Sequence, residues 1–397
     1  MKELSHALAE IPVSAPTAVD ALVKERRARG ERIISFCVGE PDFPTPEHIA
    51  RAGMDAIEAG DTKYTHPSGT PALRKAAAEA LRRDYGLDYA PEQVVITTGA
   101  KYAVYAAVMA LCDAGDEVIL PAPYWPSYRP ILRLCGAKPV AVPCAAENGW
   151  KLMPEALKAA ITEKTKAIIL NNPNNPSGAV YFREELEPLA EVIREADLYV
   201  IADEVYGRLT FDGKAFTPAA ALGADMLSRT VTVGGVSKGY AMTGWRIGFA
   251  AAGAEIARRI SVFVNHTTGG ACTVSQAAAL AALRGSDEDS RRMCAEYEAR
   301  RDILCEALSA FPYVSFCRPE GAFYLLLNMR EALSRMDGIA DDLALAMALL
   351  REENVAAVPC ADYGLPGFLR LSYTLPIPEM LEGVARLKAF LERRVRT

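Results

Sequence analysis

The sequence predicts an α/β protein: a mostly parallel sheet flanked by helices forms a large domain, and a smaller α+β domain stands beside it. Three observations support this. Short apolar runs alternate with helical segments through the middle of the chain, and polar motifs follow those runs directly. The 397 residues, 51% of them hydrophobic, are enough for a large core and a second unit. Because parallel sheets bind ligands at the carboxyl ends of their strands, a site is expected at those motifs.

The alternation begins with a buried strand at 93–98 (QVVITT) and a helix at 100–111. Further apolar runs, rich in β-branched residues, predict strands at 117–120, 138–142, 166–170, 198–202, 230–233 and 247–251. Helices are predicted between them at 155–160 and 183–196. Such runs are typical of strands that are covered on both faces.

A long polar helix is predicted over 287–310, and the segments 322–327, 340–351, 368–373 and 378–394 indicate the smaller α+β unit. The run at 32–38 reads as a lone strand, and we expect it to join that unit. We therefore divide the chain into an N-terminal arm and part of the small domain (1–45), a large domain (46–285) and a small C-terminal domain (286–397).

Composition excludes several functions. The net charge of −6, with dispersed lysine and arginine, argues against nucleic acid as a partner. No apolar run is long enough to cross a membrane, and the first residues lack the apolar core of a signal peptide. Nine scattered cysteines without a CxxC pair indicate the reducing cytoplasm, and four histidines without paired spacing predict no metal site.

Two motifs at strand ends could hold a flat, anionic ligand. In Gly99-Ala100-Lys101 a glycine joins a strand to a helix, which leaves backbone N–H groups for an anion; a plain tight turn is an equal alternative. In PAPYWP (121–126), Trp125 is held between prolines. Its indole could stack on a heteroaromatic ring, or it could simply pack under a loop.

Two further motifs carry polar side chains behind buried strands. Asn175 lies in NNPNNPSG (171–178) and can donate to a phenolate oxygen or a carboxylate. Asp203 and Tyr206 lie in ADEVY (202–206), after the run LYVIA. A carboxylate at the end of a buried strand needs a partner, and a protonated pyridine nitrogen would fit; a helix N-cap is the competing role for Asp203.

Lys238 and Arg246 share the stretch VGGVSKGYAMTGWRIG (233–248). A lysine crowded by small residues suits an imine with an aldehyde cofactor, and a nearby arginine suits a phosphate; a surface lysine and a capping arginine are the plainer alternative. Arg370 stands inside the apolar strand GFLRLSY (367–373). A buried guanidinium fits a carboxylate ligand, and a structural ion pair is the other interpretation.

Together the motifs NNPNNPSG, ADEVY and SKGYAMTGWRIG resemble those of the class I/II, aspartate aminotransferase-like enzymes of the fold-type I pyridoxal phosphate group. The resemblance extends from about Val38 to Tyr373. It implies a pyridoxal 5′-phosphate-dependent transaminase that exchanges an amino group between an L-amino acid (aspartate-like, aromatic or other) and a 2-oxo acid such as 2-oxoglutarate. A pyridoxal phosphate-dependent C–S β-lyase of the same fold is the alternative.

The resemblance also implies roles for single residues. Lys238 would be the Schiff-base lysine and proton shuttle, Asp203 would pair with the pyridine nitrogen, and Trp125 would stack on the ring. Tyr206 and Asn175 would bind the cofactor phenolate oxygen. The residues implied as phosphate ligands are Gly99, Ala100, Lys101, Ser237 and Arg246. Those implied around the substrate are Gly39, Trp125, Asn175 and Arg370, of which Arg370 would clamp the α-carboxylate.

Tyr64 matches the tyrosine that family members lend to the phosphate of a neighbouring subunit, so the resemblance implies a homodimer. The chain departs from its relatives in two places. The segment TTGGAC (267–272) replaces a run that borders the active site, and Met109 stands where some relatives carry a basic residue. We expect Cys360 to serve packing.

Overall fold

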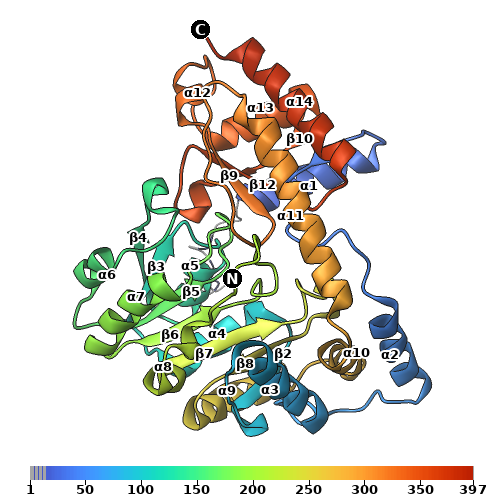
Figure 1. The fold of residues 1–397 in the computed structure, drawn as a ribbon, viewed down its shortest axis with the longest axis vertical. Helices are drawn as coiled ribbons and strands as arrows, with labels where there is room; N and C mark the ends of the chain where they lie inside the picture. The colour runs from blue at the N-terminus through green and yellow to red at the C-terminus, as the bar shows by residue number, and fades with distance from the viewer. Residues whose placement is uncertain (1–3, 5–7, 9–10, 12–14, 397) are drawn as a thin grey trace.

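The computed structural model describes residues 4, 8, 11 and 15–396. They form two layered units, shown in Figure 1, with the large sheet in the lower part of the view and the small unit above it. The helix α11 (Glu288–Ser309) runs from one unit to the other. In the described part of the chain, no helix is both long and apolar enough to cross a membrane.

The large sheet has seven strands in the order β2-β8-β7-β6-β5-β3-β4. Only β8 runs against the others, so the predicted mostly parallel sheet is confirmed. Its strands are β2 (Val94–Thr97), β3 (Glu117–Ala122), β4 (Lys138–Pro143), β5 (Thr165–Asn171), β6 (Tyr199–Asp203), β7 (Thr230–Gly235) and β8 (Gly248–Ala251). Each one lies on a predicted strand, within a few residues at either end.

Helices cover both faces of this sheet, which is why its strands are apolar throughout. One face packs on α4 (Ala100–Leu111), α5 (Tyr128–Leu134) and α9 (Ala254–Thr267). The opposite face packs at one end on α3 (Pro71–Tyr85) and α10 (Thr273–Arg284), and at the other end on α6 (Pro154–Ala160), α7 (Arg183–Glu195) and α8 (Ala224–Arg229). The helix α2 (Glu47–Glu58) lies against α10.

The small unit contains an antiparallel sheet in the order β11-β12-β9 and a parallel pair, β1-β10. Its strands are β1 (Ile34–Ser35), β9 (Tyr324–Asn328), β10 (Val355–Ala356), β11 (Val358–Pro359) and β12 (Phe368–Ser372). Its helices are α1 (Ala15–Ala28), α12 (Arg330–Ser334), α13 (Asp342–Glu353) and α14 (Ile377–Arg394). The run at 32–38 is therefore not a lone strand, because Ile34 and Ser35 pair with Val355 and Ala356.

The sequence pattern did not indicate β10 and β11. Each has two residues, too few for a period of two to be visible. They form because tertiary packing brings partners to them: β10 receives β1 from the N-terminal segment, and β11 pairs with β12. These pairings place the segment before Gly39 beside the strand that carries Arg370.

Candidate active site

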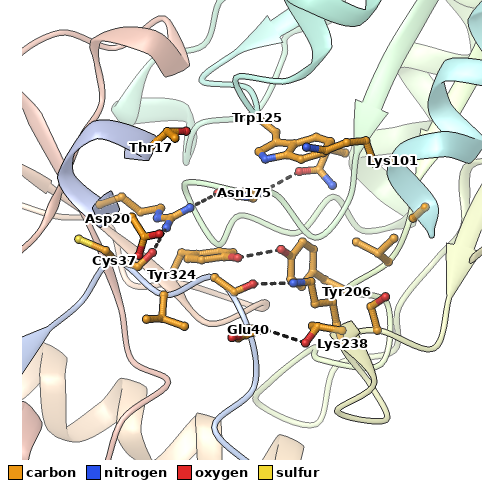
Figure 2. A pocket seen from close by; sticks show the side chains of 18 of the residues that line it. Thr17, Asp20, Cys37, Glu40, Lys101, Trp125, Asn175, Tyr206, Lys238 and Tyr324 are labelled. Atoms are coloured by element: carbon orange, nitrogen blue, oxygen red, sulfur yellow. Dashed lines mark hydrogen bonds between the residues drawn. The ribbon is translucent and has the colours of Figure 1, made fainter. Parts of the chain in front are cut away.

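A cavity of about 720 Å³ lies where the carboxyl ends of the large sheet face the small unit. Its lining includes the sequence-predicted residues Gly39, Ala100, Lys101, Trp125, Asn175, Asp203, Tyr206, Ser237, Lys238, Arg246 and Arg370. Figure 2 shows Trp125 and Lys238 on opposite sides of it, with Asn175 and Tyr206 between them. Strands more than 130 residues apart in sequence thus contribute to one site because their carboxyl ends meet at the same edge.

Lys238 follows β7 and reaches into the cavity, where its Nζ donates to the Gly39 carbonyl oxygen at 2.5 Å. Protein surrounds the amine, and this burial lowers the pKa of Lys238 to about 8, against a smaller opposing effect of the Glu40 carboxylate. Arg370 and Arg246 lower it further. The amine can therefore lose its proton close to neutral pH, as a nucleophile for a carbonyl carbon must. The surface-lysine alternative is wrong.

Asp203 is the last residue of β6 and is buried. Its Oδ2 accepts a hydrogen bond from the Tyr128 hydroxyl at 2.6 Å, whereas its Oδ1 is buried and makes no hydrogen bond of normal geometry with the residues that the structure describes. Burial raises the pKa of Asp203 to about 6, although the bond from Tyr128 opposes this rise. No helix begins at Asp203, because the chain turns there. An unpaired buried carboxylate oxygen beside a cavity favours a ligand that can donate a hydrogen bond to it.

The start of α4 and Arg246 form a cationic end of the cavity. Gly99 has a φ of +89°, and a Cβ at this position would lie 2.5 Å from Arg246 Nη2, so only glycine lets the arginine approach the helix terminus. Arg246 is held by donating Nη1 to the Thr243 carbonyl oxygen at 2.9 Å. Burial, and then the Arg246 charge, lower the pKa of Lys101. The positive charges of Lys101 and Arg246, together with the N–H groups at the start of α4, suit the binding of a phosphate.

Arg370 lies on β12 and is buried. Its Nη1 donates to Asn175 Oδ1 at 3.1 Å and to the Tyr363 hydroxyl at 2.9 Å, and its Nη2 donates to the Cys37 carbonyl oxygen at 2.8 Å. Its Nε is buried and has no hydrogen-bond partner within the described part of the chain. Among the described residues no carboxylate pairs with this guanidinium, which does not support the structural ion pair. The arginine is aligned by neutral acceptors and keeps its charge for an anionic ligand.

Sequence reasoning missed three tyrosines that hold these groups. Tyr128 supports Asp203, Tyr363 supports Arg370, and the Tyr324 hydroxyl lies 2.8 Å from the Tyr206 hydroxyl. Tyr128 stands three residues after Trp125, and its ring lies edge-on to the indole at 5.4 Å, so the PYWP motif was a usable signal. For Tyr324, within an apolar strand, the sequence offered none.

Other predicted residues lie elsewhere. Gly99 does not line the cavity itself, although its neighbours Ala100 and Arg246 do, and the side chain of Tyr64 is fully exposed outside it. Met109, on α4, is partly exposed and does not line the cavity. Cys360 is buried in an apolar cluster with Val358, as expected for packing, and burial raises the pKa of its thiol. In the part of the chain that the structure describes, no group of three potential metal ligands occurs.

Known proteins match the chain over almost its whole length. The profile of the family "Aminotransferase class I and II" covers residues 31–387. The aspartate aminotransferase of Bacillus subtilis (strain 168) is 40% identical over 98% of this chain and 99% of its own length. The aspartate/prephenate aminotransferase of Cereibacter sphaeroides is 41% identical over 98% of this chain and 99% of its own.

Solved structures agree with this fold. The aspartate aminotransferase of Rhizobium meliloti superposes with a TM-score of 0.95 at 38% identity, covering 99% of this chain and all of the other. The Thermus thermophilus aspartate aminotransferase with maleate gives 0.91 at 38% identity, covering 98% of this chain and all of the other. The geometry and the similarity agree, and this chain belongs to the class I and II aminotransferase family and is a transaminase.

Proposed function

We propose that the protein transfers the amino group of an L-amino acid of the aspartate type to a 2-oxo acid such as 2-oxoglutarate, with pyridoxal 5′-phosphate bound at Lys238. Relatives named as aspartate or aspartate/prephenate aminotransferases support the substrate class. The observation that carries the proposal is one cavity lined by both Lys238 and Asp203, whose buried Oδ1 makes no hydrogen bond with the described residues.

The residues present fit this cofactor. Asp203 Oδ1 would accept a hydrogen bond from the protonated ring nitrogen, Trp125 would stack on the ring, and Tyr206 and Asn175 would bind its phenolate oxygen. The phosphate would take the cationic end of the cavity, formed by Gly99, Ala100, Lys101, Ser237 and Arg246. When bound, pyridoxal phosphate supplies an aldehyde for the amino group and a ring that withdraws electrons.

The protein's own side chains would then bind, orient and move protons. Arg370, aligned by Asn175, would hold the substrate α-carboxylate with its guanidinium, whose Nε has no hydrogen-bond partner among the described residues. This fixes the α-carbon relative to Lys238. The neutral Lys238 amine would take the proton from the substrate α-carbon and deliver it to the cofactor's aldehyde carbon, and the ionised Asp203 carboxylate would hold the proton on the ring nitrogen throughout.

We also propose a homodimer in which Tyr64 reaches the active site of the partner subunit. The support is its position: an aromatic side chain with a hydroxyl is fully exposed and lies outside the cavity of its own chain. The division into an N-terminal arm, a large cofactor-binding domain over 46–285 and a small domain over 286–397 belongs to the same proposal.

The test is a substrate panel with the holoenzyme. L-aspartate with 2-oxoglutarate should yield oxaloacetate and glutamate, measured by coupling oxaloacetate to NADH oxidation, and prephenate and aromatic substrates rank the specificity. L-cystathionine without a 2-oxo acid is the control for the lyase alternative, since elimination would release pyruvate and ammonia. Elimination without amino exchange would overturn the proposal.

A further inference from the structure

Tyr324 joins the two halves of the site. It opens β9, opposite Ser372 on β12, two residues beyond Arg370. Its ring lies beneath the Arg370 guanidinium, with 4.4 Å between Arg370 Cζ and the ring centroid. Its hydroxyl lies 2.8 Å from that of Tyr206, which follows the large-sheet strand β6 (Figure 2). One buried side chain thus contacts both the arginine expected to bind substrate and the tyrosine expected to bind the cofactor.

The hydroxyl of Tyr324 lies against the backbone of Gly39. A Cβ placed on Gly39 would lie 3.0 Å from this oxygen, so the glycine backbone is packed against it. The carbonyl of Gly39 in turn accepts from Lys238. Tyr206 is the one hydrogen-bond partner of the Tyr324 hydroxyl found in the described ranges.

Two phenols that share one hydrogen bond have two protons, so the acceptor keeps its own proton for a third group. Burial raises the pKa of both hydroxyls, and the Arg370 charge opposes the rise at both. The direction of the bond follows from the partners: among the described residues the Tyr324 hydroxyl has only Tyr206 to donate to, whereas Tyr206 is expected to bind the cofactor as well. Tyr324 is therefore the donor and Tyr206 the acceptor of this bond. The other charged groups facing Tyr206 are Asp203 and Lys238, whose Nζ lies 5.9 Å from its ring centroid.

We propose that Tyr324 is a positioning residue: it donates its hydroxyl proton to Tyr206 and thereby directs the Tyr206 proton at the phenolate oxygen of bound pyridoxal phosphate. This inference rests on the proposed function. It also assigns to the small domain, through the same ring that stacks on Arg370, a direct effect on the electronic state of the cofactor.

The test is the pH titration of the visible absorbance of the lysine-bound cofactor in Tyr324→Phe, which keeps the ring under Arg370 and removes the hydroxyl. A weaker hydrogen-bond donor to the phenolate oxygen makes the nitrogen that joins Lys238 to the cofactor more basic. The midpoint should therefore rise, by about 0.5 pH unit if the bond strengthens Tyr206 as neighbouring hydrogen bonds do. In a Tyr206→Phe background the same substitution should produce no shift.

Tyr363→Phe is the matched control, because it also removes a hydroxyl beside Arg370 but one that does not touch Tyr206. It should raise KM for the amino donor and leave the midpoint unchanged. As a second variant, 3-fluorotyrosine at position 324 makes the donor more acidic without changing the fold, and it should lower the midpoint.

A lower midpoint in Tyr324→Phe would mean that Tyr206 donates to Tyr324, and the inference would be wrong. An unchanged midpoint, or an equal shift in the Tyr206→Phe background, would exclude the coupling and leave the proposed function intact. A wild-type protein that binds no cofactor on Lys238 would overturn the proposed function and this inference together.

Discussion

The two walls of the cavity are built in different ways. On the large-sheet side, Asp203 ends β6, Lys238 comes three residues after β7, and Ala100 opens α4, so the backbone of rigid elements positions each group. On the small-domain side, contacts between distant segments align Arg370, among them the Cys37 carbonyl, 333 positions away in the chain. The groups expected to do the chemistry therefore stand on one scaffold, while those expected to bind substrate depend on how the large and small units pack together.

The largest effect on activity is expected at Lys238, on the large-sheet wall. Lys238→Ala should reduce transamination by at least about 10⁴-fold, because it removes both the nucleophile and the group that moves the α-proton. Mass spectrometry after borohydride reduction should find no cofactor attached to the peptide around position 238. A reduced adduct on another lysine, with activity retained, would show that the large-sheet wall was wrongly assigned.

Asp203 is the second test of the same wall. Asp203→Asn keeps the shape but removes the charge that would hold a proton on the ring nitrogen. We expect kcat to fall by about 10²–10³-fold, as when one preorganised electrostatic group is lost. The cofactor should remain bound, as equilibrium dialysis can check. A kcat near that of the wild type would contradict the assignment.

Arg370 tests the small-domain wall. Arg370→Lys keeps a positive charge but loses the fork that donates to Asn175, Tyr363 and Cys37 together. We expect KM for the amino donor to rise by about 10–100-fold, the equivalent of one charge-assisted hydrogen bond, with a smaller change in kcat. Steady-state kinetics separate the two constants. If kcat fell sharply while KM stayed unchanged, Arg370 would contribute to the chemical step and not to substrate binding.

The pH dependence of cofactor attachment tests the large-sheet wall alone, because it follows the protonation of Lys238. The folded-state pKa of Lys238, about 8, lies below the ordinary value of 10.5, so the reactive neutral amine gains population as pH rises, reaches half at about pH 8 and approaches saturation above about pH 9. The rate at which apoprotein attaches pyridoxal phosphate, followed by stopped flow, should rise roughly tenfold from pH 7 to pH 9 and then level off. A rate that kept rising to pH 10 would mean an unperturbed lysine.

Tyr64 tests whether a partner subunit completes the site. Tyr64→Phe should weaken cofactor binding by about fivefold, the value of one hydrogen bond, as measured by equilibrium titration. Mixing this variant with Lys238→Ala subunits should restore wild-type affinity at the sites that combine an intact lysine with an intact tyrosine. Unchanged affinity in the mixture would count against an exchanged tyrosine.

The strand pattern and the motifs at its ends determined the mostly parallel sheet and the approach of Lys238, Asp203 and Arg246 to one cavity. Local sequence carries this information because parallel strands place their carboxyl ends at one edge, whatever their order. Arg370 was also identifiable, since a guanidinium inside an apolar strand needs an anion.

Only the tertiary structure decided which neutral groups align those charges. Tyr324 stands in the apolar segment GAFYLLL, where periodicity indicates core, and nothing local shows that its hydroxyl meets Tyr206. The two-residue strands β10 and β11, which place Cys37 beside Arg370, likewise have no period to detect. Hydrogen bonds between segments far apart in the chain depend on the packing of the two domains. No single stretch of sequence encodes that packing.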